Sequence, residues 1–403
     1  MTYCVNMKPS VQKFLGVLVT LVLLGGMIFL RVRISATSFD FQSSNFTFFW
    51  LAGRMLIEGE NPYNEAQYLA GHETHGIKWQ PNKIFPYPLP LAIFFVPLGF
   101  LSLPTAYLTW QVITLLVIAW TIYALLNHWQ DAAQRRLLLP IFAAMFFFGP
   151  VYLTLHTGSV GALALLAIVG AILLLERDKS LLAGMLLSLT MLKPPQGLTI
   201  LLLAGIWFLA RRDWKAIYGV AIGGIVLLVV GMIQDPLWLV KFWGASEAVM
   251  DRTQGVHSNV WAFAYLACGM TSPCRLILGG TASLTLLGLA GFLLWRNQSR
   301  LTAWEAFNII LPVGFVSTIY LWAYDQLPYL IPIVWIIGTL VKRKKSYLYA
   351  FLFLIVLELV SFFALVQQAS TSKDLWSLGT TILVLGMGVW LRLLHNIEKT
   401  YPI

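Results

Sequence analysis

The sequence is short of charged residues. Asp, Glu, Lys and Arg together make up 11% of its 403 residues, whereas hydrophobic residues make up 59%. A soluble domain carries roughly 25% charged residues. Since so few charges cannot cover a water-soluble surface of this size, we predict a single integral membrane domain over residues 1–403 and exclude soluble folds.

Cysteine is scarce as well. Cys4, Cys268 and Cys274 are the three cysteines, and none has the spacing of a zinc site or of a CxxC motif. This excludes a disulfide framework, although Cys268 and Cys274 fall in one segment that we place outside, where they can pair. A glycine-rich phosphate loop beside a strand is also missing. We therefore expect no metal, no nucleotide and no other cofactor.

The basic excess does not indicate a nucleic-acid partner. The chain has 27 Lys and Arg against 17 Asp and Glu, a net charge of +10. These basic residues form short clusters between apolar stretches, such as Lys342–Lys345 and Arg211–Arg212, and no basic stripe with interleaved aromatics occurs. Such clusters mark the inner side of a membrane. That orientation places segments 32–85, 234–274 and 322–326 on the outer side of a plasma membrane.

The apolar stretches predict an all-α bundle of about 12 transmembrane helices, because a spanning helix needs about 20 apolar residues. Stretch 14–30 is interpreted as an uncleaved first helix. Stretch 181–210 is either one helix or two short ones broken at Lys193, and the proline-rich 86–103 either spans or dips in and returns. The remaining candidates are 105–126, 138–156, 159–175, 216–233, 275–295, 303–321, 327–341, 346–366 and 374–394.

The segment 32–85 is long for a connection in a membrane protein. Residues 48–59 within it have helical spacing with apolar residues on one face. We predict a helix that lies in the membrane interface.

Two acidic residues stand out on the outer side. Asp40 follows the first predicted span at the depth of the lipid headgroups, and Asp325 lies in the aromatic-rich turn 320–326. A partly desolvated carboxyl has a raised pKa and is a better general base. The alternative for either is an ordinary solvated acid.

Lys193 interrupts an apolar stretch. A lysine there is costly unless it reaches water or meets an anion, and a phosphate is the natural anion. The alternative is a short outer turn from which the lysine reaches the surface. Arg54 and His257 are further candidates for the same task.

Several strings resemble glycosyltransferase family 87. Residues 45–63, NFTFFWLAGRMLIEGENPY, are similar to its first-loop signature, which reads roughly Asp-Phe-x-x-aromatic-aromatic-x-Ala-Gly-Arg-x-Leu-x-x-Gly-x-Asn-Pro-Tyr. Weaker matches are Phe85–Pro90 with Pro97-Leu98, Leu192–Pro194, His257–Asn259 and Trp322–Gln326. The resemblance implies a GT-C fold, an active site at the outer leaflet, a polyprenyl-phosphate sugar donor and a loop Asp as the base.

The sequence departs from that signature at Asn45, which occupies the place of the family Asp. An Asn side chain cannot act as a general base. Three alternatives remain: Asp40 takes over through a shifted loop, Asp325 does so, or the activity is lost.

The resemblance implies transfer of a hexose, with mannose the expected sugar, to a hydroxyl of a lipid or glycan acceptor, with inversion. Partners would be the polyprenyl-phosphate-linked donor, the acceptor and the bilayer. The alternatives are a membrane transporter, a lipid flippase or an inactive member. Expected site residues are Asp40, Asp325 and Asn45 for catalysis, Lys193, His257 and Arg54 for the donor phosphate, and Trp50, Tyr63, Tyr87 and Trp322 for stacking on sugar rings.

Overall fold

The computed structural model describes residues 44–77, 82–128, 144–145, 148–253, 255–269, 272–342, 347–371 and 373–400. These residues contain no β-strand, so the all-α prediction is confirmed for the described chain. The predicted span 14–30 and Asp40 lie outside the described residues.

The helices follow one another with short connections. In chain order they are α2 (Phe46–Ile57), α3 (Glu65–Thr74), α4 (Leu89–Gly99), α5 (Leu103–His128), α8 (Gly149–Thr157), α9 (Gly161–Leu175), α10 (Ser180–Leu187), η2 (Ser188–Leu192), α11 (Pro194–Arg211), α12 (Trp214–Gln234), α13 (Trp238–Arg252), α14 (Val260–Cys268), α15 (Ser272–Arg296), α16 (Ala303–Ser317), η3 (Ala323–Tyr329), α17 (Leu330–Lys342), α18 (Tyr347–Thr371), η4 (Leu375–Ser377) and α19 (Leu378–Thr400).

Within the described part of the chain, 5 helical stretches are long and apolar enough to cross a membrane, and several shorter apolar helices pack beside them. The higher number of about 12 spans is not confirmed. The five are Leu103–Asn127, Trp214–Gln234, Pro273–Arg296, Ala323–Lys342 and Leu348–Gln368.

The structure resolves the two ambiguous stretches. The stretch 181–210 is two helices, because η2 ends at Leu192 and α11 begins at Pro194, leaving Lys193 in a non-helical conformation between them. Helix α4 has only 11 residues. At 1.5 Å per residue it covers about half of a hydrocarbon layer of ~30 Å, so the stretch 86–103 does not span as a helix.

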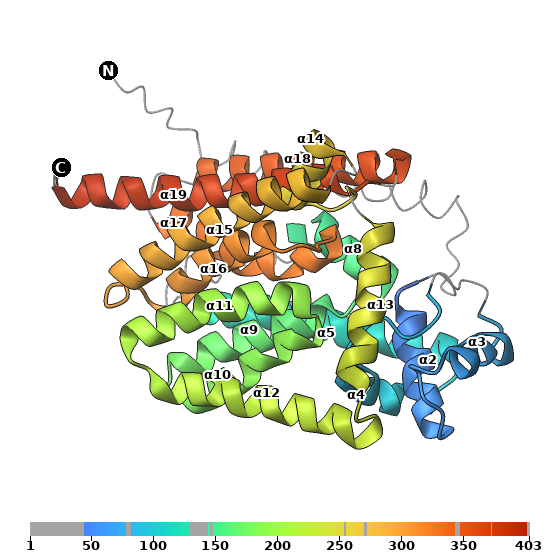
Figure 1. Cartoon of the computed structure of the whole chain (residues 1–403). Coiled ribbons are helices and arrows are strands. Elements are labelled where there is room, and N and C mark those ends of the chain that lie inside the picture. The colour runs from blue at the N-terminus through green and yellow to red at the C-terminus, as the bar shows by residue number, and fades with distance from the viewer. Residues whose placement is uncertain are drawn as a thin grey trace.

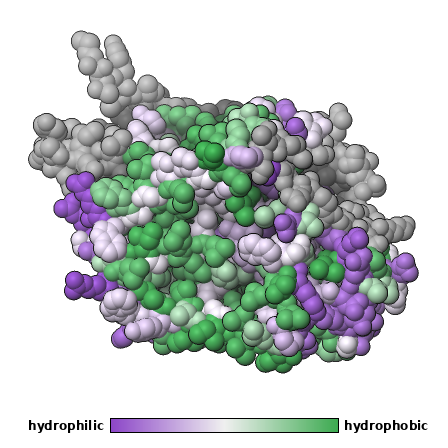
Figure 2. All heavy atoms as spheres, viewed as in Figure 1, coloured by the Kyte–Doolittle hydropathy of each residue, from purple (hydrophilic) through white to green (hydrophobic). Residues whose placement is uncertain are grey.

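The long helices α11, α12 and α19 run across the view in Figure 1, and α13 stands nearly upright at one end of them, beside α2, α3 and α4. We call this end the first-loop end. In Figure 2, hydrophobic residues cover the middle of the same face, and hydrophilic residues gather at the left edge and over the first-loop end. This distribution is typical of a membrane protein whose helices cross the bilayer.

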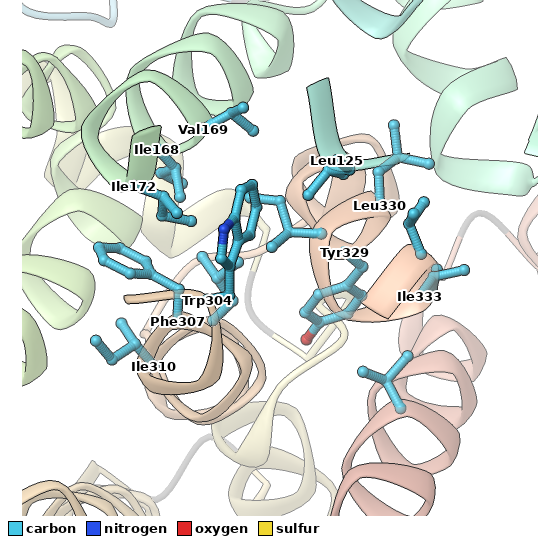
Figure 3. Close-up of a cluster of buried hydrophobic side chains, with 14 of the residues drawn as sticks. Leu125, Ile168, Val169, Ile172, Trp304, Phe307, Ile310, Tyr329, Leu330 and Ile333 are labelled. Atoms are coloured by element: carbon cyan, nitrogen blue, oxygen red, sulfur yellow. The ribbon is translucent and has the colours of Figure 1, made fainter. Parts of the chain in front are cut away.

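The core of the bundle lies where α5, α9, α16 and α17 meet (Figure 3). Trp304, Phe307 and Ile310 of α16 face Ile168 and Ile172 of α9, and all five side chains are buried. In a lipid environment such helices associate chiefly through close van der Waals packing.

Helix α2 does not have the single apolar face that we predicted for an interfacial helix. Nine of its residues are buried, on nearly every side of the helix. Helix α4 crosses it so closely that a Cβ on Gly53 would lie 2.7 Å from the carbonyl carbon of Phe95, and one on Gly99 would lie 2.8 Å from the Arg54 nitrogen. Glycine at positions 53 and 99 therefore serves the packing of α2 on α4.

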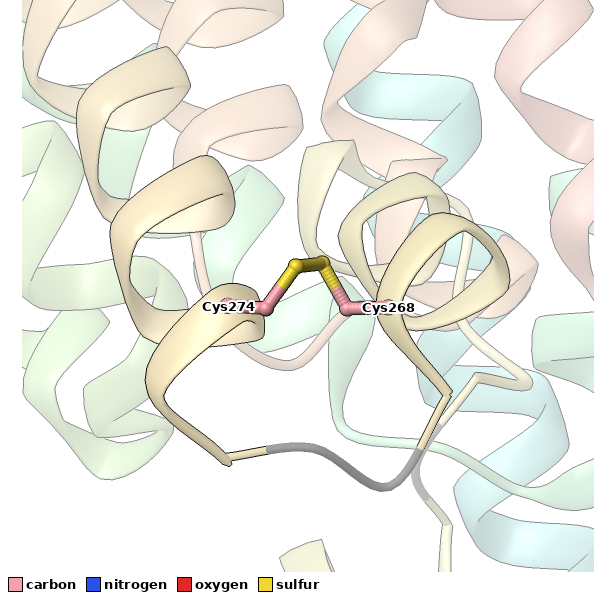
Figure 4. Close-up of a disulfide and its surroundings, with 2 residues drawn as sticks. All are labelled: Cys268 and Cys274. Carbon is pink, nitrogen blue, oxygen red and sulfur yellow. A yellow bond between two sulfur atoms is a disulfide. The ribbon is translucent and has the colours of Figure 1, made fainter.

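Cys268 and Cys274 form a disulfide (Figure 4). The bond joins the last residue of α14 to the first turn of α15. The possible pairing inferred from the sequence is confirmed.

Candidate functional site

A cavity of about 350 Å³ opens at the first-loop end. Its volume is within the range of small-molecule sites. Four parts of the chain surround it: the start of α2 with the segment before α4, the turn before α11, one face of α13 and the turn before η3. The lining residues are Asn45, Phe48, Asn82, Pro86, Tyr87, Pro88, Lys193, Pro194, Pro195, Phe242, Ser246, Val249, Met250, Thr253, Tyr320, Trp322 and Tyr324.

Three aromatic side chains project into the cavity from one extended turn. Tyr320, Trp322 and Tyr324 line it, whereas the intervening Leu321 and Ala323 are buried behind them. The backbone is extended at Trp322, where successive side chains point to opposite sides. Ala323 and Tyr324 are the first two residues of η3. The Trp322 and Tyr324 rings are nearly parallel, at 12°, with centroids 6.1 Å apart. We call Tyr320, Trp322 and Tyr324 the aromatic row.

Lys193 brings a buried ammonium group to the same wall. Its side chain is 8% exposed and forms an ion pair with Asp325, which comes from η3. The Nζ atom also lies 4.8 Å from the centroid of the Tyr324 ring and 6.0 Å from that of Tyr320. Electrostatic attraction to the ring faces adds to the ion pair. The anion that Lys193 meets in this structure is therefore Asp325.

Both carboxylate oxygens of Asp325 have partners within the protein. Oδ1 accepts from Lys193, and Oδ2 accepts from the backbone N–H of Trp322 at 3.0 Å. The carboxylate is 1% exposed and is not part of the cavity lining. In this arrangement it holds the lysine and the aromatic row rather than facing a substrate hydroxyl.

Asn45 lies at the cavity wall, immediately before α2. Its side chain is hydrogen-bonded to the Tyr324 hydroxyl. The position at which the resemblance expects an Asp is thus next to the aromatic row. Asp40 precedes it by five residues and lies outside the described residues.

Tyr87 lines the cavity, whereas Tyr63 does not. The Tyr63 hydroxyl donates to the backbone oxygen of Tyr87 and so holds the segment that precedes α4. Asn61 donates to Asp235 at 2.7 Å, and Lys241 donates to the same oxygen at 2.5 Å. The Asn-Pro-Tyr part of the first-loop string therefore ties this loop to the start of α13 and to the cavity wall.

Trp50 and Arg54 lie away from the cavity, so their use in sugar stacking and phosphate binding stays a prediction. Trp50 donates from Nε1 to the Leu101 oxygen at 3.1 Å, and Arg54 donates to Glu58 at 2.5 Å and to the Gly99 oxygen at 3.3 Å. Neither residue lines the cavity. Trp50 and Arg54 therefore contact the segment from α4 to the start of α5 rather than the cavity.

His257 lies behind the aromatic row. Its ring centroid is 4.5 Å from that of Tyr320 and 5.2 Å from that of Trp322. Burial lowers the pKa of His257 to about 4, and the nearby charge of Lys193 contributes to the lowering. A lowered pKa favours the neutral imidazole at pH 7, and the contact of His257 with the donor phosphate stays a prediction.

Helix α13 supplies lining residues that the sequence analysis missed. Phe242, Ser246, Val249 and Met250 face the cavity, whereas the neighbouring Trp243 does not line it and is 74% exposed. Their spacing of four, three and one residues matches one face of a helix. The amphipathic pattern of 238–252 is the sequence signal that could have identified this wall.

No group of three or more His, Cys, Asp or Glu side chains is arranged to hold a metal ion within the described ranges. Comparison with known families gives one finding: the profile of glycosyltransferase family 87 matches residues 85–319. The matched range includes Tyr87, Lys193, His257 and the whole of α13, and it ends just before the aromatic row. No curated protein and no solved structure matches the chain.

Proposed function

The chain belongs to glycosyltransferase family 87, and we propose that it transfers a hexose, with mannose the expected sugar, from a polyprenyl-phosphate-linked donor to a hydroxyl group of a lipid or glycan acceptor. One observation carries the choice of donor: the cavity places a lysine ammonium beside aromatic rings, next to apolar side chains of α13. Such a site fits a phosphate, a sugar and the first part of a lipid chain.

The reaction is a single displacement at the anomeric carbon. The acceptor oxygen forms the new C–O bond while the bond from the anomeric carbon to the phosphate oxygen breaks. The acceptor proton passes to a base, and polyprenyl phosphate leaves as an anion. Attack opposite the leaving group inverts the configuration.

Lys193 is the proposed partner of the leaving phosphate. Negative charge grows on the phosphate in the transition state, and a positioned cation stabilises it most where water is excluded. An ammonium has three N–H donors. Asp325 accepts one of them, so Lys193 can also donate to a phosphate oxygen in the cavity.

The aromatic row and Tyr87 are the proposed sugar contacts. Aromatic rings cover the apolar faces of a hexose, and a polar group at the ring edge orients its hydroxyls. The Trp322 indole N–H is buried and has no hydrogen-bond partner among the described residues. It is therefore available as a donor to a sugar hydroxyl.

The proposed location of the site is the outer side of the plasma membrane. The disulfide between Cys268 and Cys274 begins α15 near this end, and disulfides persist in oxidising compartments. At the opposite end, the turns after α11 and α15 carry Arg211, Arg212 and Arg296. Basic turns of this kind lie on the cytoplasmic side.

Asp40 is the proposed general base. Asp325 is occupied by Lys193, and Asn45 cannot accept the proton. Asp40 precedes the cavity-lining Asn45 by five residues, a separation of at most ~18 Å along the chain.

The test is transfer by the purified protein. Radiolabelled polyprenyl-phosphate mannose is incubated with membrane lipid extract and the protein, and lipid products are separated by chromatography. We expect a labelled product with the native chain, none with Asp40→Asn, and partial recovery when Asn45→Asp is added to that variant. The exposed Glu73→Gln is the matched control and keeps full activity.

Full activity in Asp40→Asn would remove Asp40 from the mechanism. Absence of product with every polyprenyl-phosphate hexose would overturn the proposed donor class.

A further inference from the structure

A second buried carboxyl group, that of Asp374, lies behind the aromatic row. It comes from the connection between α18 and η4, and its side chain is fully buried. Oδ2 accepts from the backbone N–H of Ala323, and Oδ1 accepts from the Ser377 hydroxyl at 2.6 Å. The backbone N–H of Asp374 donates to the Val256 oxygen at 2.7 Å.

The two carboxyl groups hold consecutive backbone groups of the row. Asp325 accepts from the N–H of Trp322, and Asp374 accepts from the N–H of Ala323. These two bonds fix the backbone at the centre of the row and, with it, the direction in which Trp322 projects into the cavity.

A buried network continues from this point. Gln326 donates from Nε2 to the Ser258 hydroxyl at 3.2 Å and to the Ser377 oxygen at 3.3 Å. The Ser258 N–H donates to the Leu321 oxygen at 3.2 Å. Three connections far apart in the sequence are thereby joined behind one wall of the cavity.

We propose that Asp374 is a positioning residue that sets the aromatic row for the sugar of the donor. The inference rests on the proposed function, because it gives the row its sugar-binding task. Asp374 is absent from the cavity lining, so it acts through Ala323 and Trp322 and not by touching the substrate.

The Ala323 N–H needs an acceptor in this position, since a buried donor without a partner is costly. An alanine at 374 removes the acceptor, whereas an asparagine retains an oxygen of the same shape. Burial raises the pKa of Asp374 to about 8, and the nearby Asp325 carboxylate adds to the rise. The asparagine amide is neutral, so it adds no charge to this buried position while its oxygen can accept from the Ala323 N–H.

The kinetic test compares Asp374→Ala, Asp374→Asn and the exposed control Ser370→Ala. We expect Asp374→Ala to raise KM for the donor about tenfold while kcat stays within about threefold, because sugar binding and not the chemical step is disturbed. Asp374→Asn returns KM to within about threefold of the native value, and Ser370→Ala leaves it unchanged.

A second readout does not depend on activity. A fluorinated tyrosine introduced at position 320 reports the environment of the row by ¹⁹F NMR. The signal shifts or broadens in Asp374→Ala and keeps its native position in Asp374→Asn. If Asp374→Ala does not fold, Ser377→Ala replaces it, with a smaller shift and a rise in KM of about threefold.

An unchanged KM together with an unchanged ¹⁹F signal in the alanine variant overturns the positioning role. If the native chain transfers no sugar, the proposed function is contradicted. If the ¹⁹F signal nevertheless shifts in Asp374→Ala and not in Asp374→Asn, the role of Asp374 in positioning the row still stands.

Discussion

The bundle core and the wall behind the aromatic row are both buried, but they are held together differently. In the core, Trp304, Phe307 and Ile168 pack as apolar surfaces. Behind the row, Lys193 and Asp325 are as deeply buried and are joined by an ion pair and hydrogen bonds. A core of apolar side chains tolerates substitutions that keep its volume, whereas a buried charge does not tolerate loss of its partner.

We expect the largest effect on stability and on transfer from Lys193→Met. It leaves the Asp325 carboxylate buried without its counter-ion, which costs roughly 3–5 kcal/mol of stability. It also removes the cation proposed for the phosphate, so we expect transfer to fall more than about 100-fold. Thermal unfolding in detergent and the transfer assay measure the two effects.

The double variant Lys193→Met with Asp325→Asn separates these effects. The neutral pair recovers most of the lost stability but not the transfer. Native-like transfer by the double variant would contradict the phosphate role of Lys193.

The next largest effect is expected from Trp322→Leu, which is compared with Trp50→Leu. Trp322 lines the cavity, so its loss raises KM for the donor about tenfold with little loss of stability. Trp50 is a buried residue of α2 whose indole N–H donates to the Leu101 carbonyl. Its loss therefore lowers the unfolding temperature and leaves KM unchanged. The opposite pattern, measured by initial rates and thermal unfolding, would mean that the sugar site lies elsewhere.

A substitution in the bundle core tests how the apolar region responds to loss of volume. Phe307→Leu removes buried volume from the region in Figure 3 and should cost about 1–2 kcal/mol of stability. Because no charge loses a partner, kcat and KM per folded molecule stay at native values. A change of KM in this variant would show that the core and the cavity are coupled.

A smaller effect is expected from His257, and it depends on pH. The pKa of His257 falls from near 6.5 in the unfolded chain to about 4 in the folded protein. Below pH 6.5 the unfolded chain binds a proton that the folded chain does not, so stability is lost as pH falls toward 4. His257→Gln should flatten that part of the stability profile and leave transfer between pH 7 and 8 unchanged. A steep loss of transfer there would restore a direct role for the imidazole.

The smallest effect is that of Arg54→Gln. The side chain is 34% exposed and pairs with Glu58 on the same helix. Exposed pairs of this kind contribute roughly 0–1 kcal/mol. Transfer should stay within about twofold of native in the same assay, and a larger fall would place Arg54 in the donor site.

The sequence indicated the cavity in part. Lys193 stood out because a lysine inside an apolar stretch needs an anion, and the aromatic turn around Asp325 was noted for its carboxylate. What could not be foreseen is that the two form one pair, since they are 132 positions apart. The positions of Trp50 and Arg54 away from the cavity could not be predicted, because periodicity shows which faces of a helix are apolar but not which neighbours cover them.

Composition and hydropathy alone determined that this chain is a helical membrane protein, because apolar residues in long runs can satisfy their backbone in lipid only as helices. The sequence also indicated the first-loop string, the unusual position of Lys193 and the possible disulfide between Cys268 and Cys274. Only the tertiary structure decided which of these residues meet at the cavity. Helix crossings such as that of α2 with α4 set the distances between side chains, and electrostatic and hydrogen-bond energies depend on those distances.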